Sequence, residues 1–185
     1  MIKDTIVQYV CFVTNLGLEE FMPEWQRYAK RMKAENFEVT LYEQSPGSKN
    51  RFHYFSRHEW ANGNANLNFF ENRKSEHLPE HVVKVVQAGG YLRLLPVQRK
   101  EKAKGDIFLV AFVGHNDTDI EFYQDLTQYT RLTIHQAYFE SCSYGYILEF
   151  IVPARESNDL ISLLKLRPSV ETYMYSECQV PAVKV

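Results

Sequence analysis

The 185-residue sequence predicts an α+β protein whose two halves share one order of strands and helices. Segments with the β-branched and aromatic composition of strands alternate with segments in which apolar residues recur every three or four positions, as on the buried face of a helix. The order strand, helix, strand, strand, helix, strand occurs twice along the chain, and a polar, basic stretch at residues 99–105 separates the two occurrences. Two similar units joined by a linker are therefore expected.

The first half begins with a strand and an amphipathic helix. Residues 5–14 are mostly β-branched and aromatic, as in a strand covered on both faces. Pro23 is expected to mark the first turn of the regular helix that follows. Residues 37–44 and 51–60 then alternate with period two around a turn at residues 45–48, which predicts a hairpin. The apolar stripe of the helix consists of Leu18, Phe21, Met22, Trp25, Ala29 and Met32.

A second helix and a fourth strand complete the first half. The helix is expected to begin at Pro79, because proline is favoured at the first helical position, and to end at Gly89 and Gly90. Residues 91–97 predict the strand. The expected buried face of the helix is formed by Leu78, Val82, Val85 and Val86.

The second half repeats this order. Each half has the ferredoxin-like βαββαβ order, in which helices cover one face of a four-stranded antiparallel sheet. The predicted division is therefore one half over residues 1–98, the linker over residues 99–105, and a second half over residues 106–185; whether this second half is degenerate stays open. The second-half elements are a strand at 106–114, a helix carrying Ile120, Phe122, Tyr123, Leu126 and Tyr129, strands at 132–141 and 144–152, a helix at 157–166 and a strand at 170–180.

Both faces of the predicted sheets carry apolar side chains, so neither face is expected to lie in water. On strand 51–60, Phe52, Tyr54, Ser56, His58 and Trp60 share one face, and His53, Phe55, Arg57 and Glu59 share the other. The simplest arrangement packs the two halves sheet to sheet with their helices outward. The sequence thus predicts a pseudo-dimeric α/β barrel.

The third strand ends in Glu59 and Trp60, and His77 and His81 follow near the expected second helix. In these residues the first half, over roughly residues 5–97, resembles the antibiotic-biosynthesis-monooxygenase group of the dimeric α/β-barrel superfamily. The whole chain would then be a tandem fusion of two such units. That group contains cofactor-independent oxygenases of aromatic polyketides, haem-degrading enzymes and domains without an established activity. The second half matches it by element order only.

The candidate site combines the resemblance with the polar residues of strand 51–60. His53, Arg57 and Glu59 share one strand face, and with His135 and Glu149 they are expected to form polar islands inside an apolar barrel. There Arg57 would hold an anionic or phenolic substrate while a His or Glu moves a proton. A purely structural ion pair is the alternative. The candidate catalytic residues are His77, Arg57 and His53, and the candidate ligand-binding residues are Trp60, His81, Glu59, Tyr54 and Phe70.

The functional hypothesis is that the barrel binds a small aromatic or apolar ligand and acts as a cofactor-independent monooxygenase. The alternative is a non-catalytic ligand-binding or structural barrel. Haem binding and RNA binding are further alternatives, the latter because Tyr144 and Tyr146 lie on a strand of a βαββαβ unit. No metal site is expected, since Pro79 disrupts the helical spacing of His77 and His81.

Composition limits the partners. A net charge of −2 and a pI near 6.3 argue against nucleic-acid or membrane-surface partners. The first ten residues lack a secretion signal, so a cytoplasmic location is expected, with Cys11, Cys142 and Cys178 as reduced thiols. A small aromatic molecule is the expected ligand, no cofactor is expected, and either a monomeric pseudo-dimer or a homodimer fits.

Overall fold

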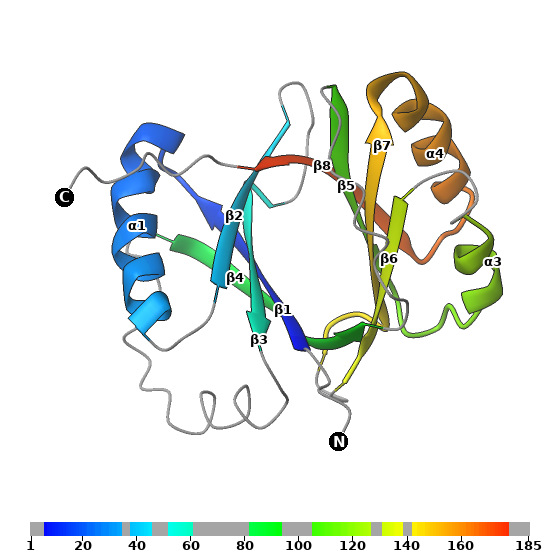
Figure 1. Cartoon of the computed structure of the whole chain (residues 1–185), viewed down its shortest axis with the longest axis horizontal. Coiled ribbons are helices and arrows are strands. Elements are labelled where there is room, and N and C mark those ends of the chain that lie inside the picture. The colour runs from blue at the N-terminus through cyan, green and yellow to red at the C-terminus, as the bar shows by residue number, and fades with distance from the viewer. Residues whose placement is uncertain are drawn as a thin grey trace.

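The computed structural model describes residues 6–34, 38–45, 52–60, 82–93, 105–126, 131–138 and 142–177. It shows an α+β fold of antiparallel sheets with helices on their outer sides (Figure 1). The elements are β1 (Ile6–Thr14), α1 (Leu18–Ala34), β2 (Glu38–Gln44), β3 (Tyr54–Trp60), β4 (Val82–Arg93), β5 (Asp106–Val113), α3 (Ile120–Asp125), β6 (Arg131–Ala137), β7 (Tyr146–Pro153), the 3-10 helix η3 (Ala154–Glu156), α4 (Ser157–Leu164) and β8 (Val170–Glu177).

The strands close into a barrel in the order β1-β3-β2-β8-β5-β7-β6-β4. This order contains two runs of four strands, β4-β1-β3-β2 and β8-β5-β7-β6. If the strands β1 to β4 and β5 to β8 are each counted from one to four, both runs have the order 4-1-3-2. Antiparallel pairs β2–β8 and β4–β6 join the two runs. The two runs are therefore hydrogen-bonded to each other at both of their edges.

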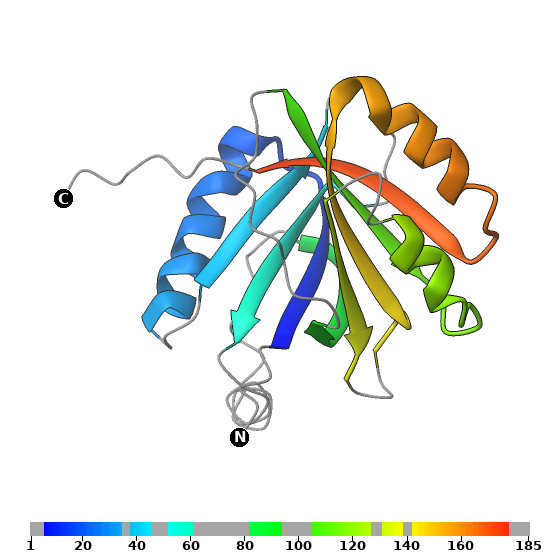
Figure 2. The ribbon, with the colours of Figure 1, turned by 45° about the vertical axis from the view of Figure 1, so that its right-hand side comes forward.

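The helices lie outside the barrel on two sides. Helix α1 covers the sheet of β1 to β4, and α3 and α4 lie on the side of β5 to β8 (Figures 1 and 2). In the described part of the chain, no helix has the length and apolar character needed to cross a membrane.

Strand alternation divides the apolar side chains into three buried layers. From β1, Val7, Tyr9 and Cys11 point into the barrel, whereas Val10 and Phe12 point toward α1. The α1 layer is completed by Phe21, Trp25, Tyr54 and Trp60 among others. A third layer lies between the second sheet and helices α3 and α4, and it includes Leu109, Tyr123, Leu148, Phe150, Leu160 and Leu164.

Most predicted elements are confirmed, including the hairpin of β2 and β3. The expected second helix is wrong from residue 82 onward, because Val82–Arg93 forms strand β4, which pairs with β1 and β6. The physical reason is that Val82, Val85 and Val86 are β-branched and lose side-chain freedom in a helix. Their spacing, read as a helical stripe, also suits a strand.

Two smaller differences concern α1 and the cysteines. Helix α1 begins at Leu18, so Pro23 lies inside it and does not mark its first turn. Cys11 and Cys142 are buried, whereas Cys178 lies outside the described residues, so the expectation of reduced thiols stays a prediction. The linker at residues 99–105 also lies outside them, apart from Gly105, so the domain boundaries stay a prediction.

Candidate functional site

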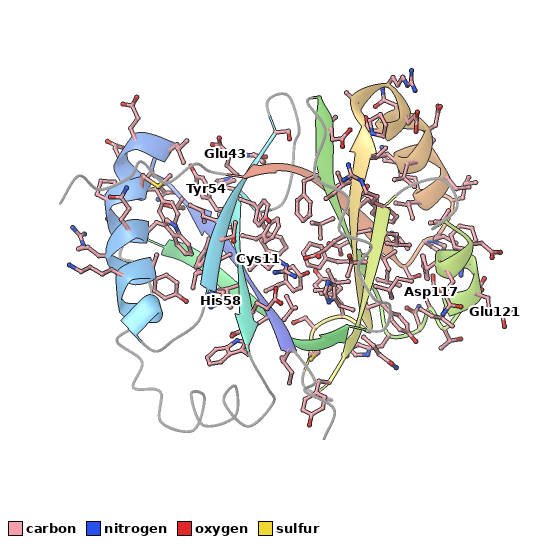
Figure 3. The ribbon with its side chains drawn as sticks, in the orientation of Figure 1. Cys11, Glu43, Tyr54, His58, Asp117 and Glu121 are labelled. Carbon is pink, nitrogen blue, oxygen red and sulfur yellow. The ribbon has the colours of Figure 1, made fainter. Side chains whose placement is uncertain are left out.

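Five polar side chains meet inside the barrel, and we call them the interior cluster: Tyr9, Arg57, Glu59, His135 and Glu149. They come from β1, β3, β6 and β7. Figure 3 shows side chains of both sheets directed into the space between them. The cluster forms because each of these residues occupies an inward position of its strand, with Tyr9 directly opposite Arg57 across the β1–β3 pair.

The carboxylate of Glu149 is the centre of the cluster. Its Oε1 accepts hydrogen bonds from the hydroxyl of Tyr9 and from Nε of Arg57, the latter at 2.6 Å. Nη1 of Arg57 donates to Oε2 of Glu59 at 2.9 Å. Nε2 of His135 lies 3.0 Å from Oε2 of Glu149, although the two are not aligned for a hydrogen bond.

These contacts keep Glu149 ionised. Burial by itself would raise the pKa of its carboxyl group, but the positive charge of Arg57 and the contacts with His135 and Tyr9 outweigh burial and hold the pKa well below its usual range. A carboxylate with a lowered pKa is a weak base. Glu149 is therefore suited to holding positive charge beside it and unsuited to accepting a substrate proton.

The pKa values of Tyr9 and Arg57, which both donate hydrogen bonds to Glu149, are raised. Burial and the neighbouring negative charge of Glu149 raise the pKa of Tyr9 well above its ordinary value, so the hydroxyl keeps its proton. Burial would lower the pKa of Arg57, but Glu149, Tyr9 and Glu59 raise it, so the guanidinium stays charged. The cluster thus contains one fixed cation between two carboxylates.

Two groups in the cluster retain unused hydrogen-bonding capacity. Both ring nitrogens of His135 are buried and make no hydrogen bond within the described part of the chain. Arg57 uses Nε and Nη1, while its Nη2 donates to none of the described residues. Buried polar groups are normally satisfied, so the ring nitrogens of His135 require an explanation, and a bound molecule is one such explanation; Nη2 of Arg57 is not among the buried unsatisfied atoms and is accessible to solvent or to a ligand.

The cluster extends from the barrel interior toward solvent. The side chain of His135 is 0% exposed, that of Glu149 10%, that of Arg57 16% and that of Glu59 34%. A molecule approaching from solvent would meet Glu59 and Arg57 first, and it would have Glu149 and His135 behind them.

Aromatic rings surround the cluster. Tyr9 has its ring centroid 6.0 Å from those of Phe55 and His135, and 6.4 Å from that of Phe112. Tyr42 stacks on Phe55 with centroids 4.6 Å apart. The charged groups are thus placed in apolar surroundings, where electrostatic interactions are stronger than in water.

The structure brings together four of the five polar residues expected from the sequence to form islands: Arg57, Glu59, Glu149 and His135. The fifth, His53, precedes β3 at the opposite end of the strand from Glu59, and its Nδ1 bonds to the carbonyl oxygen of Thr14 at 2.9 Å. It therefore takes no part in the cluster.

Tyr54 and Trp60, expected to bind ligand, lie on the other face of β3. Both belong to the layer beneath α1, where Tyr54 stacks on Phe21 with centroids 4.7 Å apart. They therefore do not line the face that carries Arg57. The remaining candidates, His77, His81 and Phe70, lie outside the described residues.

Sequence reasoning missed Tyr9. The signal was its position in a strand expected to be covered on both faces, since a buried tyrosine hydroxyl normally has a hydrogen-bond partner. The identity of that partner could not be found, because Glu149 lies 140 residues further along the chain.

A metal or haem does not fit the described residues. No three or more described His, Cys, Asp or Glu side chains are grouped so as to hold a metal ion. His135 has free nitrogens, but its side chain is completely enclosed and contacts Tyr9 and Glu149, so a haem plane could not reach it.

A second polar cluster lies outside the barrel beside α3, and we call it the outer cluster: Asp117, Asp119, Tyr123, Arg167 and Ser169. Asp117, marked in Figure 3, accepts hydrogen bonds from Tyr123, Ser169 and Nη2 of Arg167, each at 2.7 Å. Burial opposes ionisation of Asp117, but these donors lower its pKa well below the usual range. The cluster ties the start of α3 to the turn before β8.

A surface pocket of about 270 Å³ lies near the end of β6. Its residue His115 is held by a contact of 2.8 Å between Nε2 and the carbonyl oxygen of Cys142. None of its lining side chains has a buried polar atom left unsatisfied. The interior cluster is therefore the stronger candidate site.

The sequence matches no protein-family model and no curated protein. Solved structures share the fold. An anthrone oxidase-like protein superimposes with a TM-score of 0.62 at 10% identity, covering 96% of this chain and 92% of its own. A mutant of chlorite dismutase from Candidatus Nitrospira defluvii gives 0.59 at 10% identity, covering 95% and 93%, and the imidazole complex of that enzyme also gives 0.59 at 10%, covering 95% and 92%.

Both kinds of neighbour belong to the dimeric α/β-barrel superfamily with ferredoxin-like halves. The resemblance suggested by the sequence thus agrees with the neighbours at the level of the fold. At 10% identity the likeness carries no activity or residue role to this chain.

Proposed function

We propose that this protein binds a small, largely apolar aromatic molecule at the solvent-facing end of the interior cluster and oxidises it with molecular oxygen, without a bound metal or organic cofactor. The single observation that carries the proposal is the buried ionisable cluster among aromatic rings, in which Arg57 Nη2 and both nitrogens of His135 remain unused by the described residues. Ionisable groups in such surroundings are concentrated at functional sites. The fold it shares with an anthrone oxidase-like protein is consistent with this chemistry.

We further propose that the chain is a fusion of two ferredoxin-like units, so that it forms alone the barrel that two subunits form in a dimer. The equal strand order of the two runs supports this. In such a fusion the two units are free to diverge. The interior cluster draws residues from both, with Arg57 from the first and Glu149 and His135 from the second.

In the proposed reaction, an activated CH₂ group of an anthrone-type substrate becomes a carbonyl. The C–H bond breaks, its proton passes to a base, and the electron pair left on carbon reduces O₂ to a carbon-bound hydroperoxide. Loss of water then leaves C=O, so that R₂CH₂ and O₂ give R₂C=O and H₂O. The protein has to stabilise the negative charge that develops on the substrate and to receive the proton.

The described residues offer both functions. Nη2 of Arg57 would donate to the substrate oxygen on which the negative charge develops. His135, which is buried behind Glu149, would receive the proton through a water molecule, and Glu149 at 3.0 Å would stabilise the resulting imidazolium. Tyr9 would hold Glu149 in place. His77 stays a predicted catalytic residue.

The test is oxygen uptake in the presence of anthrone, with formation of anthraquinone followed by absorbance and the spontaneous oxidation subtracted. We expect acceleration by the wild type and its loss in the double variant Arg57→Met, Glu149→Leu, which removes both charges together so that neither is left unpaired. Arg167→Met in the outer cluster is the control and should retain activity. Absence of any acceleration by the wild type would contradict the oxygenase proposal.

A non-catalytic ligand-binding barrel is the second candidate function. The observation that favours it is the engagement of Glu149 by three partners, which is also expected of a structural network. Binding of anthrone without oxygen uptake would support this candidate over the oxygenase.

A further inference from the structure

The charges around Arg57 bear on which aromatic ligands the interior cluster can accept. An isolated arginine at the mouth of an apolar site would attract carboxylates, since a guanidinium binds them through two parallel hydrogen bonds. Arg57 is not isolated. Its Nε and Nη1 are bound at 2.6 Å and 2.9 Å by the carboxylates of Glu149 and Glu59.

These two contacts engage two of the five N–H donors of Arg57, and each engages it with a carboxylate. An incoming carboxylate would therefore compete with Glu149 and Glu59 for a cation that is already shared. It would also approach two carboxylates that already share this cation. Repulsion between like charges in this partly buried site would weaken the binding of a carboxylate.

An uncharged hydroxyl group neither competes with the two carboxylates for Arg57 nor is repelled by them. Its oxygen can accept from Nη2 of Arg57, and its proton can be donated to a carboxylate oxygen of Glu59 or Glu149. Glu149 is held ionised by Arg57 and Tyr9, and therefore remains an acceptor at neutral pH. The buried imidazole of His135, whose nitrogens make no hydrogen bond to described residues, lies directly behind it.

We propose that Glu59 and Glu149 make the site selective for uncharged aromatic hydroxyl compounds and exclude aromatic carboxylates. This inference rests on the proposed function and specifies its ligand class. Glu59 is the specificity-determining residue open to experiment, because its side chain is 34% exposed and its replacement leaves the Arg57–Glu149 pair intact.

The experiment measures the binding of naphthalene, 2-naphthol and 2-naphthoate by titration calorimetry at pH 7. The three probes have the same ring system and differ in one substituent. For the wild type we expect 2-naphthol to bind most tightly and 2-naphthoate to bind about tenfold or more weakly than 2-naphthol, a ratio equivalent to about 1.4 kcal/mol.

Glu59→Gln should raise the affinity for 2-naphthoate about tenfold, because it removes one negative charge and replaces a charged acceptor of Nη1 of Arg57 with a weaker, neutral one. Glu43→Gln is the matched control. Glu43 lies on the neighbouring strand β2 opposite Tyr54, a residue of the α1 layer, and therefore on the other face of the sheet. It should change none of the three affinities.

The outcomes separate the inference from the proposed function. If 2-naphthol and 2-naphthoate bind the wild type equally, or if Glu59→Gln keeps its circular dichroism and melting temperature without gaining affinity for 2-naphthoate, the selectivity is wrong while ligand binding stands. If none of the three probes binds the wild type, both the ligand-binding proposal and the selectivity are overturned.

Discussion

The interior and outer clusters are built from the same groups and differ in how completely these are satisfied. In each, a carboxylate accepts a hydrogen bond from a tyrosine and forms an ion pair with an arginine. Asp117 of the outer cluster receives further donors from Ser169 and the backbone of Asp119. The interior cluster, in contrast, leaves His135 and one nitrogen of Arg57 without hydrogen-bond partners among the described residues.

The difference indicates different roles. The outer cluster joins two neighbouring connections and uses all three guanidinium nitrogens of its arginine, as expected of a group that fixes loops. The interior cluster joins four strands, lies among aromatic rings and retains unused donors and acceptors. An unsatisfied buried network is costly to maintain without a function. The comparison therefore agrees with a stabilising role for the outer cluster and with the ligand binding that we propose for the interior one.

The largest expected effect on stability is that of Arg57→Met. It would leave Glu149 buried without its cation, which typically costs about 3–5 kcal/mol of unfolding free energy. Urea denaturation measures this. The double variant Arg57→Met, Glu149→Leu should recover most of the lost unfolding free energy. If the double variant is as unstable as the single one, the loss comes from the missing ion pair and not from an uncompensated buried charge.

Arg167→Met is the corresponding change in the outer cluster and should cost less. Arg167 is 26% exposed, and Asp117 keeps Tyr123 and Ser169 as donors. A loss as large as that of Arg57→Met would contradict the distinction between a buried and a partly exposed network.

The next largest expected effect is a loss of stability at acidic pH, caused by protonation of Glu149 and Asp117. Glu149 and Asp117 both have folded-state pKa values below those of the unfolded chain, which lie near about 4. Their contribution is therefore fully present above about pH 5 and is lost as the pH falls toward the folded values, on the order of 2–3 kcal/mol for the Glu149 network. Denaturation midpoints between pH 7 and pH 3 measure the loss. Glu149→Gln should flatten part of the slope, and an unchanged slope would exclude Glu149 as its source.

Tyr9→Phe should reduce stability by about 2 kcal/mol, because it removes a hydrogen bond to a buried carboxylate. Tyr123→Phe should cost less, since Asp117 retains more donors than Glu149 would. Thermal unfolding of the two variants in parallel gives the comparison. A larger loss for Tyr123→Phe would reverse our ranking of the two networks.

Ser169→Ala is expected to have the smallest effect, about 1 kcal/mol or less, because a neutral hydroxyl donor contributes less than a charged one. Melting temperature is the readout, and binding of 2-naphthol should not change. A loss of binding would mean that the outer cluster affects the barrel interior.

Much of this fold could be predicted from the sequence because each strand carries its own alternation. The pattern of residues 51–60 placed Arg57 and Glu59 on one face and Tyr54 and Trp60 on the other, as the structure has them. The helix predicted after residue 81 was wrong for a local reason. A run of valines fits both the apolar stripe of a helix and a strand, and pairing with β1 makes this segment a strand.

The candidate site was predictable in part for the same reason. Alternation identified Arg57, Glu59, His135 and Glu149 as inward polar residues, but it could not show that they meet. That depends on how the strands are staggered around the closed barrel, which brings Glu149 to Arg57 across 92 residues and to Tyr9 across 140. His53 immediately precedes the first residue of β3, so it lies at the other end of that strand, beside Thr14.

The most direct test is to follow the Nε–H signals of Arg57 and Arg167 by ¹H–¹⁵N correlation NMR while 2-naphthol is added. Each arginine reports on its own cluster within one molecule. We expect the Arg57 signal to shift with saturation while that of Arg167 stays in place. A shift of Arg167 alone, or saturable binding that moves neither signal, would contradict the assignment of ligand binding to the interior cluster.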